Sequence, residues 1–366
     1  MNVLVVSNMF PSKENPSYGS FVKTFVEGLE REDDIKYKLA VIRGKKRNLF
    51  KKASAYWKFF HQASFLLRSR QFDLTYVHYA NHSLLPLLLV DNKSRGRFIV
   101  NFHGSDVFPE NLIASLVSKL TAILISKALR VVVPSEPFAQ EVTSRYKVAK
   151  TEIFISPSGG IDTEKFRRSD SSRYSGEINK KLNVAFLSRL DFGKGLEVLL
   201  HSLTLLKAKD IKIKLDVGGT GSLHSIFQEK VSELEIQDEV CFHGHLDPKT
   251  IPQFFQKSDV FVFPSYRKGE SLGLVGLEAM AAGLPVIGSN IPSIASYVES
   301  GVSGYLFDPQ NPSSLANRLE EFTCLTANER CLMSRNAILT AERYDRKIVQ
   351  KSMSFFLRSI YQTDKT

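Results

Sequence analysis

Short apolar runs alternate with segments of helical periodicity along the whole chain. Runs of about four to eight apolar residues are typical of buried strands, and their regular alternation with helices favours parallel sheets. The strands predicted for the first half are Val3–Val6, Lys38–Ile42, Phe72–Tyr79, Phe98–Phe102, Ala128–Pro134 and Ile153–Ser156. Those predicted for the second half are Asn183–Leu187, Lys212–Val217, Val240–Phe242, Phe261–Phe263, Leu284–Ile287 and Gly304–Phe307. The pattern therefore predicts an α/β protein.

The segments between and after these strands predict helices. They include Phe21–Leu29, Leu196–Leu206, Gly273–Ala282, Pro312–Phe322, Ala327–Tyr344 and Arg346–Tyr361. A chain of 366 residues is long enough for two domains of ordinary size. A glycine-rich stretch near Gly160, followed by the polar residues 167–176, is typical of a linker. We therefore expect one domain at 1–170 and a second at 180–345.

Residues 261–290, FVFPSYRKGESLGLVGLEAMAAGLPVIGSN, predict a strand, a loop, a helix and a further strand. Glu270 lies in the loop, and Glu278 lies in the helix. The first helical N–H groups lack intrahelical partners and favour an anion; they belong to residues near Leu272, Gly273 and Leu274. A diphosphate bound there would leave one carboxylate for a sugar and the other for a ribose. On spacing alone, an ordinary helix with a solvated glutamate fits equally well.

The turn after the strand Asn183–Leu187 reads SRLDFGKG and carries two cations, Arg189 and Lys194. Cations at a strand-to-helix turn suit a diphosphate, although surface cations are common at such turns. The next strand ends in GGTG at 218–221, which includes Gly219. This is not the G-x-G-x-x-G pattern of nicotinamide-binding proteins.

The first half also has candidates at the ends of its strands. His103 follows the strand Phe98–Phe102 in the run HGSD, which ends at Asp106. Open α/β sheets bind ligands at the carboxyl ends of their strands, so both residues fall where chemistry is expected, although a lone histidine is often structural. Gly19 lies in the loop after the first strand, where it either lets the backbone approach a ligand or simply forms a turn.

The run from Pro264 to Ile287 resembles the E-x7-E signature of the retaining GT-B glycosyltransferases called family 4, with Glu270 and Glu278 as its two acids. The segments RLDFGKG at 189–195, HGSD at 103–106 and PSGGID at 157–162 are similar to other motifs of that family. The resemblance thus covers nearly the whole chain. It implies a GT-B fold, in which two doubly wound Rossmann-like domains face a central cleft. The first domain would bind the acceptor, the second would bind the donor, and a last helix at about 346–363 would cross back to the first.

The resemblance also implies roles for individual residues. His103, Asp106 and Glu270 correspond to the catalytic group. The residues that correspond to donor-binding positions are Gly19, Arg189, Lys194, Gly219, His245, Leu272, Gly273, Leu274 and Glu278. The reaction expected is transfer of a sugar from a UDP or GDP donor to a hydroxyl acceptor with retention, in which the leaving phosphate helps to deprotonate the acceptor. The chain departs from the family at Ser271 and Leu272, where glycine and phenylalanine are usual, so the donor sugar stays open.

Cysteine and histidine usage argues against metals and disulfides. Cys241, Cys324 and Cys331 are scattered, which favours a reducing compartment. No Cys or His spacing resembles a zinc site, His78 and His82 lack suitable company, and no Asp-x-Asp occurs. We expect no metal and no cofactor besides the nucleotide sugar. Without a signal sequence or an apolar run of 18 residues, we expect a cytoplasmic protein, with the inner face of the membrane as a peripheral location.

The net charge of +11 is confined to the first half. Residues 1–175 carry 27 lysines and arginines against 16 acidic residues, whereas residues 176–366 carry 22 of each. The densest part, 43–60, holds the cations Arg43, Lys45, Lys46, Arg47, Lys51, Lys52 and Lys58 and the apolar residues Leu49, Phe50, Tyr56, Trp57 and Phe60. Read as a helix, it is typical of an interfacial segment on an anionic membrane, which would suit a lipid-linked glycan acceptor. The alternative is a solvated helix whose aromatic side chains pack on the domain core.

Two other functions remain open at this point. One is a nucleotide-sugar epimerase or a phosphorylase of similar fold. The other is a basic module that binds membranes or nucleic acid, for which salt-dependent DNA binding without nucleotide-sugar binding would be diagnostic. Because the neutral second half carries the full donor motif set, we do not expect a nucleic-acid partner.

Overall fold

The computed structural model describes residues 1–46, 48–109, 111–167 and 181–363. The chain divides into two compact units, unit 1 of Met1–Gly160 and Lys347–Thr366, and unit 2 of Ile161–Arg346. The predicted boundaries at 170 and 180, and most of the predicted linker, lie outside the described residues. Residues 161–167 belong to unit 2, although the sequence placed them in the first domain. The reason is the short helix α7 (Thr163–Phe166), whose Phe166 is buried in a core of unit 2.

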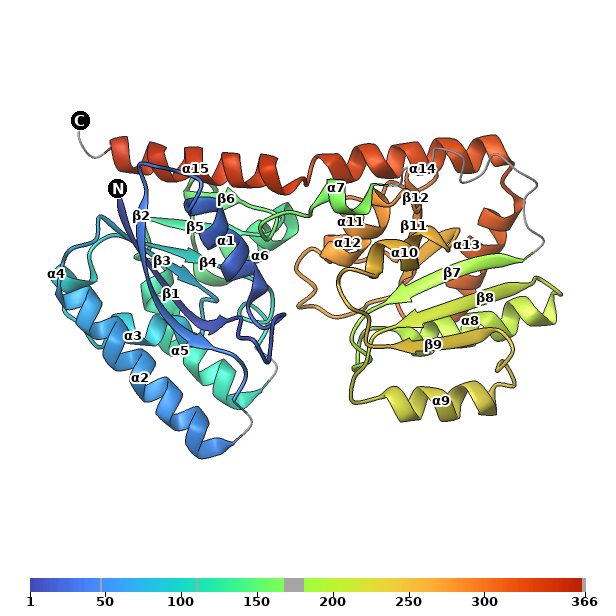
Figure 1. The fold of residues 1–366 in the computed structure, drawn as a ribbon, viewed down its shortest axis with the longest axis horizontal. Helices are drawn as coiled ribbons and strands as arrows, with labels where there is room; N and C mark the ends of the chain where they lie inside the picture. Colours follow the sequence, from blue (N-terminus) through green and yellow to red (C-terminus); the bar gives the residue numbers. More distant parts are fainter. Residues whose placement is uncertain (47, 110, 168–180, 364–366) are drawn as a thin grey trace. The chain divides into compact units, whose positions relative to one another are not determined.

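Unit 1 is built on a six-stranded sheet in the order β2-β1-β3-β4-β5-β6 (Figure 1). Its strands are β1 (Asn2–Phe10), β2 (Lys36–Arg43), β3 (Leu74–His78), β4 (Phe98–Asn101), β5 (Arg130–Val133) and β6 (Ile153–Ile155). All neighbouring strands are parallel. The order reverses between β1 and β3, where the loops that follow the two strands lead in opposite directions.

Helices cover both faces of this sheet. They are α1 (Ser20–Leu29), α2 (Leu49–Arg68), α3 (Leu85–Leu88), α4 (Asn92–Arg95), α5 (Leu112–Ile125), α6 (Glu136–Tyr146) and α15 (Arg346–Thr363), with 3₁₀ turns η1 (His82–Leu84) and η2 (Lys150–Glu152). Helices α1 and α15 pack on one face of the sheet. Helices α2, α5 and α6 and the η1–α3 segment pack on the other. The predicted last helix is thus part of unit 1, whereas α5 was not predicted.

Unit 2 repeats the plan with the order β12-β11-β10-β7-β8-β9, again all parallel. Its strands are β7 (Leu182–Leu187), β8 (Ile213–Gly218), β9 (Val240–Gly244), β10 (Val260–Phe263), β11 (Val286–Ser289) and β12 (Gly304–Phe307). Its longer helices are α8 (Leu196–Ala208), α9 (His224–Glu233), α11 (Leu274–Ala281), α13 (Pro312–Cys324) and α14 (Ala327–Glu342), and α10 (Ile251–Gln256) and α12 (Pro292–Ala295) are short. The order reverses between β7 and β10. The expectation of two doubly wound α/β domains is confirmed.

The expectation of a helix throughout 43–60 is wrong at its start. Arg43 ends β2, Gly44 takes a positive φ of 68°, and α2 begins only at Leu49. Asn48 caps the helix because its side chain accepts hydrogen bonds from two backbone N–H groups of the first turn. Arg47, which belongs to the basic segment, lies outside the described residues. Among the helices of the described ranges, none combines the length and the apolar character needed to span a bilayer.

Unit 1 depends on the apolar face of α15. Leu357 of this helix is 0% exposed, whereas Phe355 is 74% exposed. We predict that Leu357→Ala destabilises the protein by about 2–5 kcal/mol, because it leaves a cavity in the core. Phe355→Ala should change the stability by less than about 0.5 kcal/mol. Urea unfolding of both variants checks this, and equal effects would contradict the packing of α15 described above.

Candidate functional site

The loops after β7 and β10 meet where the strand order of unit 2 reverses. The Lys194 ammonium lies 2.7 Å from Oε2 of Glu270, and their side chains are only 14% and 12% exposed. The Ser265 hydroxyl donates to the same oxygen at 2.7 Å. Because β7 and β10 are neighbours in the sheet, two residues that are 76 positions apart in the sequence form one buried pair.

Glycines let the two loops approach so closely. Gly193 and Gly195 both take positive φ, and a Cβ on Gly195 would lie 2.0 Å from the carbonyl oxygen of Pro264. The Gly193 carbonyl accepts a hydrogen bond from the Tyr266 backbone N–H, which ties the two loops together. The glycines on both sides of Lys194 therefore let the turn after β7 lie against the loop after β10, with the lysine between them.

The Glu270 carboxyl stays ionised in spite of its burial. Burial raises its pKa, but the Lys194 charge and the hydrogen bonds from Lys194 and Ser265 outweigh that effect, so the pKa lies below its ordinary value. Glu270 is thus a carboxylate at neutral pH, and its negative charge is balanced by one cation.

Helix α11 begins directly after this loop. Gly273 caps it with φ 74°, and a Cβ there would lie 2.3 Å from the Phe263 ring. Leu272, Gly273 and Leu274 therefore surround the N-terminal end of the helix, which carries a partial positive charge. Glu278 lies inside α11, and burial raises its pKa to about 7 against the lowering effect of the Lys165 and Arg346 charges.

Three further candidates lie at the ends of neighbouring strands. Arg189 follows β7, is 68% exposed and pairs with Asp191 at 2.9 Å rather than with Glu270. Gly219 follows β8 with φ 114°, and a Cβ there would lie 1.8 Å from the Ser188 carbonyl oxygen. His245 follows β9 and is exposed. All three share the carboxyl edge of the sheet with the ion pair, but they do not join it.

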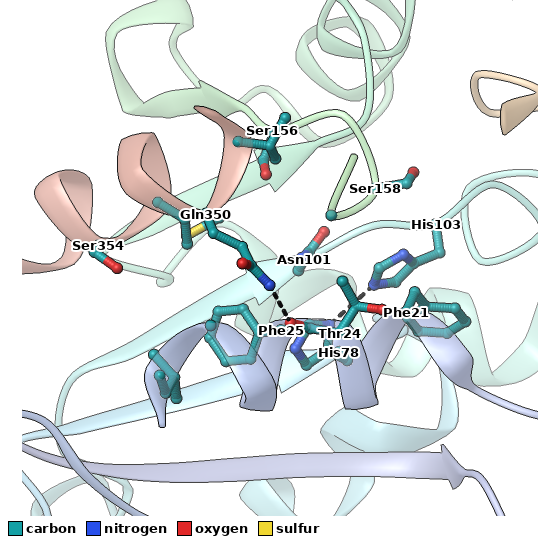
Figure 2. Close-up of a pocket in the computed structure, with 15 residues that line it drawn as sticks. Phe21, Thr24, Phe25, His78, Asn101, His103, Ser156, Ser158, Gln350 and Ser354 are labelled. Atoms are coloured by element: carbon teal, nitrogen blue, oxygen red, sulfur yellow. Dashed lines mark hydrogen bonds between the residues drawn. The ribbon is translucent and has the colours of Figure 1, made fainter. Parts of the chain in front are cut away.

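In unit 1, His103 belongs to an aromatic cluster at the ends of β3 and β4 (Figure 2). Its Nε2 lies 3.1 Å from Nδ1 of His78, and its ring stacks on Phe21 with 3.9 Å between the ring centroids. These side chains line a pocket together with residues of α1 and α15, including Thr24 and Gln350. The close-up shows Gln350, which donates to the Thr24 carbonyl, on the α15 side of this pocket.

The contact between the two histidines indicates which protons they carry. In the described part of the chain, Nε2 of His78 is buried and has no hydrogen-bond partner. An orphaned acceptor costs less than an orphaned N–H group, which favours a proton on Nδ1 of His78 that it donates to Nε2 of His103. His103 then carries its own proton on Nδ1. Burial lowers the pKa of His103 to about 3, and the pKa of His78 well below its ordinary value, so both rings are neutral at pH 7.

Asp106 and Gly19 shape the backbone around this cluster. The Asp106 carboxylate accepts hydrogen bonds from the backbone N–H groups of His103, Gly104 and Ala80. Burial raises its pKa to about 6, against the lowering effect of these bonds. We therefore regard Asp106 as a positioning residue for His103. Gly19 caps α1 with φ 71°, so it sets the start of the helix that carries Phe21.

Sequence reasoning missed three residues that complete these clusters. His78 and Phe21 hold His103, and Ser265 holds Glu270. A signal for His78 was available, because it lies near the end of the predicted strand Phe72–Tyr79, and the next predicted strand leads to His103. Its neighbour His82, considered with it as a metal ligand, instead begins η1 and packs near Tyr56.

Asp216, Cys241 and His243 are the one group of described residues that could hold a metal ion. The two oxygens of Asp216 already have partners, however, since His243 lies 2.6 Å from one and Lys214 lies 3.7 Å from the other. This cluster of β8 and β9 is accounted for by those interactions, and we assign no metal to it.

Two Rossmann-like units, each with candidate residues at the carboxyl end of its sheet, define a protein of the GT-B architecture. The structure of Anabaena HepE in complex with UDP and glucose has a TM-score of 0.73 at 16% identity and covers 98% of this chain and 100% of its own. Sucrose-phosphate synthase from Thermosynechococcus elongatus has a TM-score of 0.77 at 18% identity, with 99% of each chain covered. The predicted GT-B fold is confirmed.

Two family models match consecutive parts of the chain, Glycosyltransferase Family 4 at residues 20–165 and Glycosyl transferases group 1 at residues 168–338. The chain belongs to the family 4 glycosyltransferases. Among curated relatives, the alpha-monoglucosyldiacylglycerol synthase of Streptococcus pneumoniae is 27% identical over 68% of this chain and 57% of its own length. Spore coat protein SA of Bacillus subtilis is 28% identical, with 70% of each covered. The D-inositol 3-phosphate glycosyltransferase of Paenarthrobacter aurescens is 28% identical over 54% of this chain, which spans about half of that relative.

The buried ion pair gives a test of stability. We predict that Lys194→Met destabilises the protein by about 3–5 kcal/mol at pH 7, because it leaves the Glu270 charge buried and unpaired. Since the pKa of Glu270 is lowered in the native protein, the stabilisation by the pair is present above the ordinary carboxyl pKa and is lost as the pH falls. The difference between variant and wild type should therefore shrink toward pH 4.

The control is Lys209→Met, which breaks a pair with Glu320 whose side chains are far more exposed. It should cost less than about 1 kcal/mol at either pH. Urea unfolding at both pH values measures the two differences. A Lys194 variant that behaves like this control would show that the pair does not hold the loops together.

Proposed function

We propose that the protein transfers a sugar from a nucleotide diphosphate donor, of the UDP or GDP type, to a hydroxyl acceptor with retention at the anomeric carbon. The observation that carries this proposal is the buried Lys194–Glu270 pair beside the N-terminus of α11. Membership of a glycosyltransferase family supports it.

In this proposal the donor binds along the carboxyl edge of the unit 2 sheet. The diphosphate takes the N-terminus of α11 and the charges of Lys194 and Arg189, which stabilise the negative charge that develops on the leaving group. Glu270 accepts hydrogen bonds from sugar hydroxyls, and Glu278 accepts them from the ribose. Gly219 and His245 lie by the nucleotide base.

His103 takes part in the same reaction from unit 1. As a neutral ring with its proton on Nδ1, it donates a hydrogen bond to the sugar or the leaving phosphate. Neither His103, whose Nε2 faces His78, nor Asp106, which is used by backbone N–H groups, is arranged as a base. This supports a retaining reaction in which the leaving phosphate takes the proton from the hydroxyl group of the acceptor substrate.

We propose that the reaction needs no metal, because Lys194, Arg189 and the helix N-terminus supply the positive charge that a metal would otherwise provide. Undiminished transfer in excess EDTA is the expected result.

We further propose a lipid-linked or cell-surface glycan as the acceptor and a peripheral location on the inner face of the membrane. The basic segment 43–60 would contact the anionic surface. The S. pneumoniae relative, which is named for a glucosylated diacylglycerol, supports a lipid acceptor. The aromatic residues of the segment divide: Trp57 is exposed, but Tyr56 and Phe60 pack on the core of unit 1.

The decisive experiment is a screen of common nucleotide sugars for donor-dependent release of nucleoside diphosphate. We expect release with one donor, and a loss of at least about 100-fold in His103→Ala and Glu270→Ala. The exposed Glu233→Ala is the matched control and should keep full activity. Thermal melting separates lost activity from lost fold, and full activity in either site variant would refute the assignment.

Glu278 gives a prediction for the pH dependence of donor binding. Because burial raises the pKa of the Glu278 carboxyl to about 7, this group is partly protonated at neutral pH. The protonated form accepts hydrogen bonds from the ribose less well than the carboxylate does. Donor affinity should rise between pH 6 and pH 8, and Glu278→Gln should flatten that rise while it raises the donor KM more than it lowers kcat. Calorimetric titration with the nucleoside diphosphate at several pH values checks this, and an unchanged slope in the variant would contradict it.

A further inference from the structure

Helix α5 turns an apolar face away from the core of unit 1. Its outward residues Leu112, Ile113, Leu116, Leu120 and Ile123 are between 53% and 89% exposed. From Ile113 onward they recur every three to four residues, while Val117, Leu124 and Ile125 of the same helix are buried. The outer face of a surface helix is normally polar, and a continuous apolar patch usually marks an interaction site.

Two neighbouring elements extend this apolar surface. Helices α2 and α5 both pack against α3, and Figure 1 shows all three on the same side of the first sheet. On α2, Phe50, Trp57 and Phe65 are exposed, and Leu89 is exposed directly after α3. We call α2, α3 and α5 together the three-helix surface.

The charges on this surface indicate which kind of partner it would bind. None of the three helices contains an aspartate or a glutamate. Their cations are Lys51, Lys52, Lys58, Arg68 and Lys119. Exposed apolar side chains on helices whose only charged residues are cations fit an anionic lipid surface, whereas a second copy of this chain would bring like charges together.

The length of α5 indicates how it would meet the lipid. Its 14 residues extend about 21 Å, which is too short for the hydrocarbon core of about 30 Å. An amphipathic helix of this kind lies in the plane of the interface, with its apolar face at the boundary between headgroups and acyl chains.

We propose that the three-helix surface docks on an anionic membrane, with the apolar face of α5 inserted at the acyl boundary and the cations of α2 on the headgroups. This deepens the proposed function, since it assigns the membrane contact to a helix outside 43–60 and puts an apolar contribution beside the electrostatic one. Salt separates the two contributions, because screening weakens the electrostatic attraction and leaves the apolar contribution in place.

The protein carries its own reporter for this contact. Trp57 is the single tryptophan of the chain and is exposed on α2. Binding of the full chain to vesicles of phosphatidylcholine with phosphatidylglycerol should shift its emission to shorter wavelengths, and vesicles of phosphatidylcholine alone should give little shift. Flotation should show part of the binding surviving at about 0.5 M NaCl, where electrostatic attraction is largely screened.

A triple variant isolates the role of α5. Ile113→Gln, Leu116→Gln and Leu120→Gln together should weaken vesicle binding at least about tenfold and abolish the part that survives salt, because each apolar side chain withdrawn from the boundary loses its burial. The matched control is Ile226→Gln, Leu332→Gln and Leu339→Gln, which alters exposed apolar residues of unit 2 and should bind like wild type. Lys51→Gln, Lys52→Gln and Lys58→Gln should instead remove the salt-sensitive part.

Equal binding by the α5 variant and the wild type, or no binding by the wild type, would overturn the proposal. So would a lipid-free dimer that the α5 variant abolishes, since the face would then serve self-association. Without vesicles, the α5 variant should release nucleoside diphosphate from the donor as fast as the wild type. That result would support a role of α5 at the surface only. Arg189→Ala, which removes an exposed cation of the donor site, should weaken that release and keep vesicle binding, so failure of the surface and failure of the donor site give different results.

Discussion

The ion pair between Lys194 and Glu270 is the constraint on which the candidate site of unit 2 depends. Two charges withdrawn from water are costly unless they meet each other in good geometry. Here the meeting requires β7 beside β10 and a turn with glycine on both sides of Lys194. The sheet topology and the turn are thus both needed to form the contact between Lys194 and Glu270. A ligand that offers hydroxyls to Glu270 or a phosphate to Lys194 finds groups that are already fixed, so little of its binding energy is spent on ordering them.

The same short stretch of chain gives two carboxyls opposite properties. Glu270 and Glu278 are both largely buried, but only Glu270 touches a cation, and its pKa lies below the ordinary value. The charges of Lys165 and Arg346 reduce the effect of burial on Glu278 without reversing it, and its pKa rises to about 7. Since protonation turns a carboxylate from an acceptor into a donor, only Glu278 is poised to change its hydrogen bonding near neutral pH.

Much of the fold and of the site in unit 2 could be predicted from the sequence. The buried strands are continuous apolar runs, and the glutamate pair with the GKG turn is a specific pattern. The start of α2 was misplaced because Gly44 and Asn48 were not recognised as a turn and a helix cap. Helix α5 was missed because it is apolar on both faces, so it lacks the contrast on which periodicity depends.

The histidine pair could not be predicted for a different reason. His78 ends a largely apolar strand, and only the pairing of β3 with β4 brings it to His103. That contact decides the chemistry open to unit 1. With Nε2 of His103 facing His78 and Asp106 committed to backbone N–H groups, both polar side chains at this strand end are donors or supports rather than bases. In the proposed reaction the proton acceptor is therefore a group of the substrate, and the leaving phosphate of a nucleotide sugar is such a group.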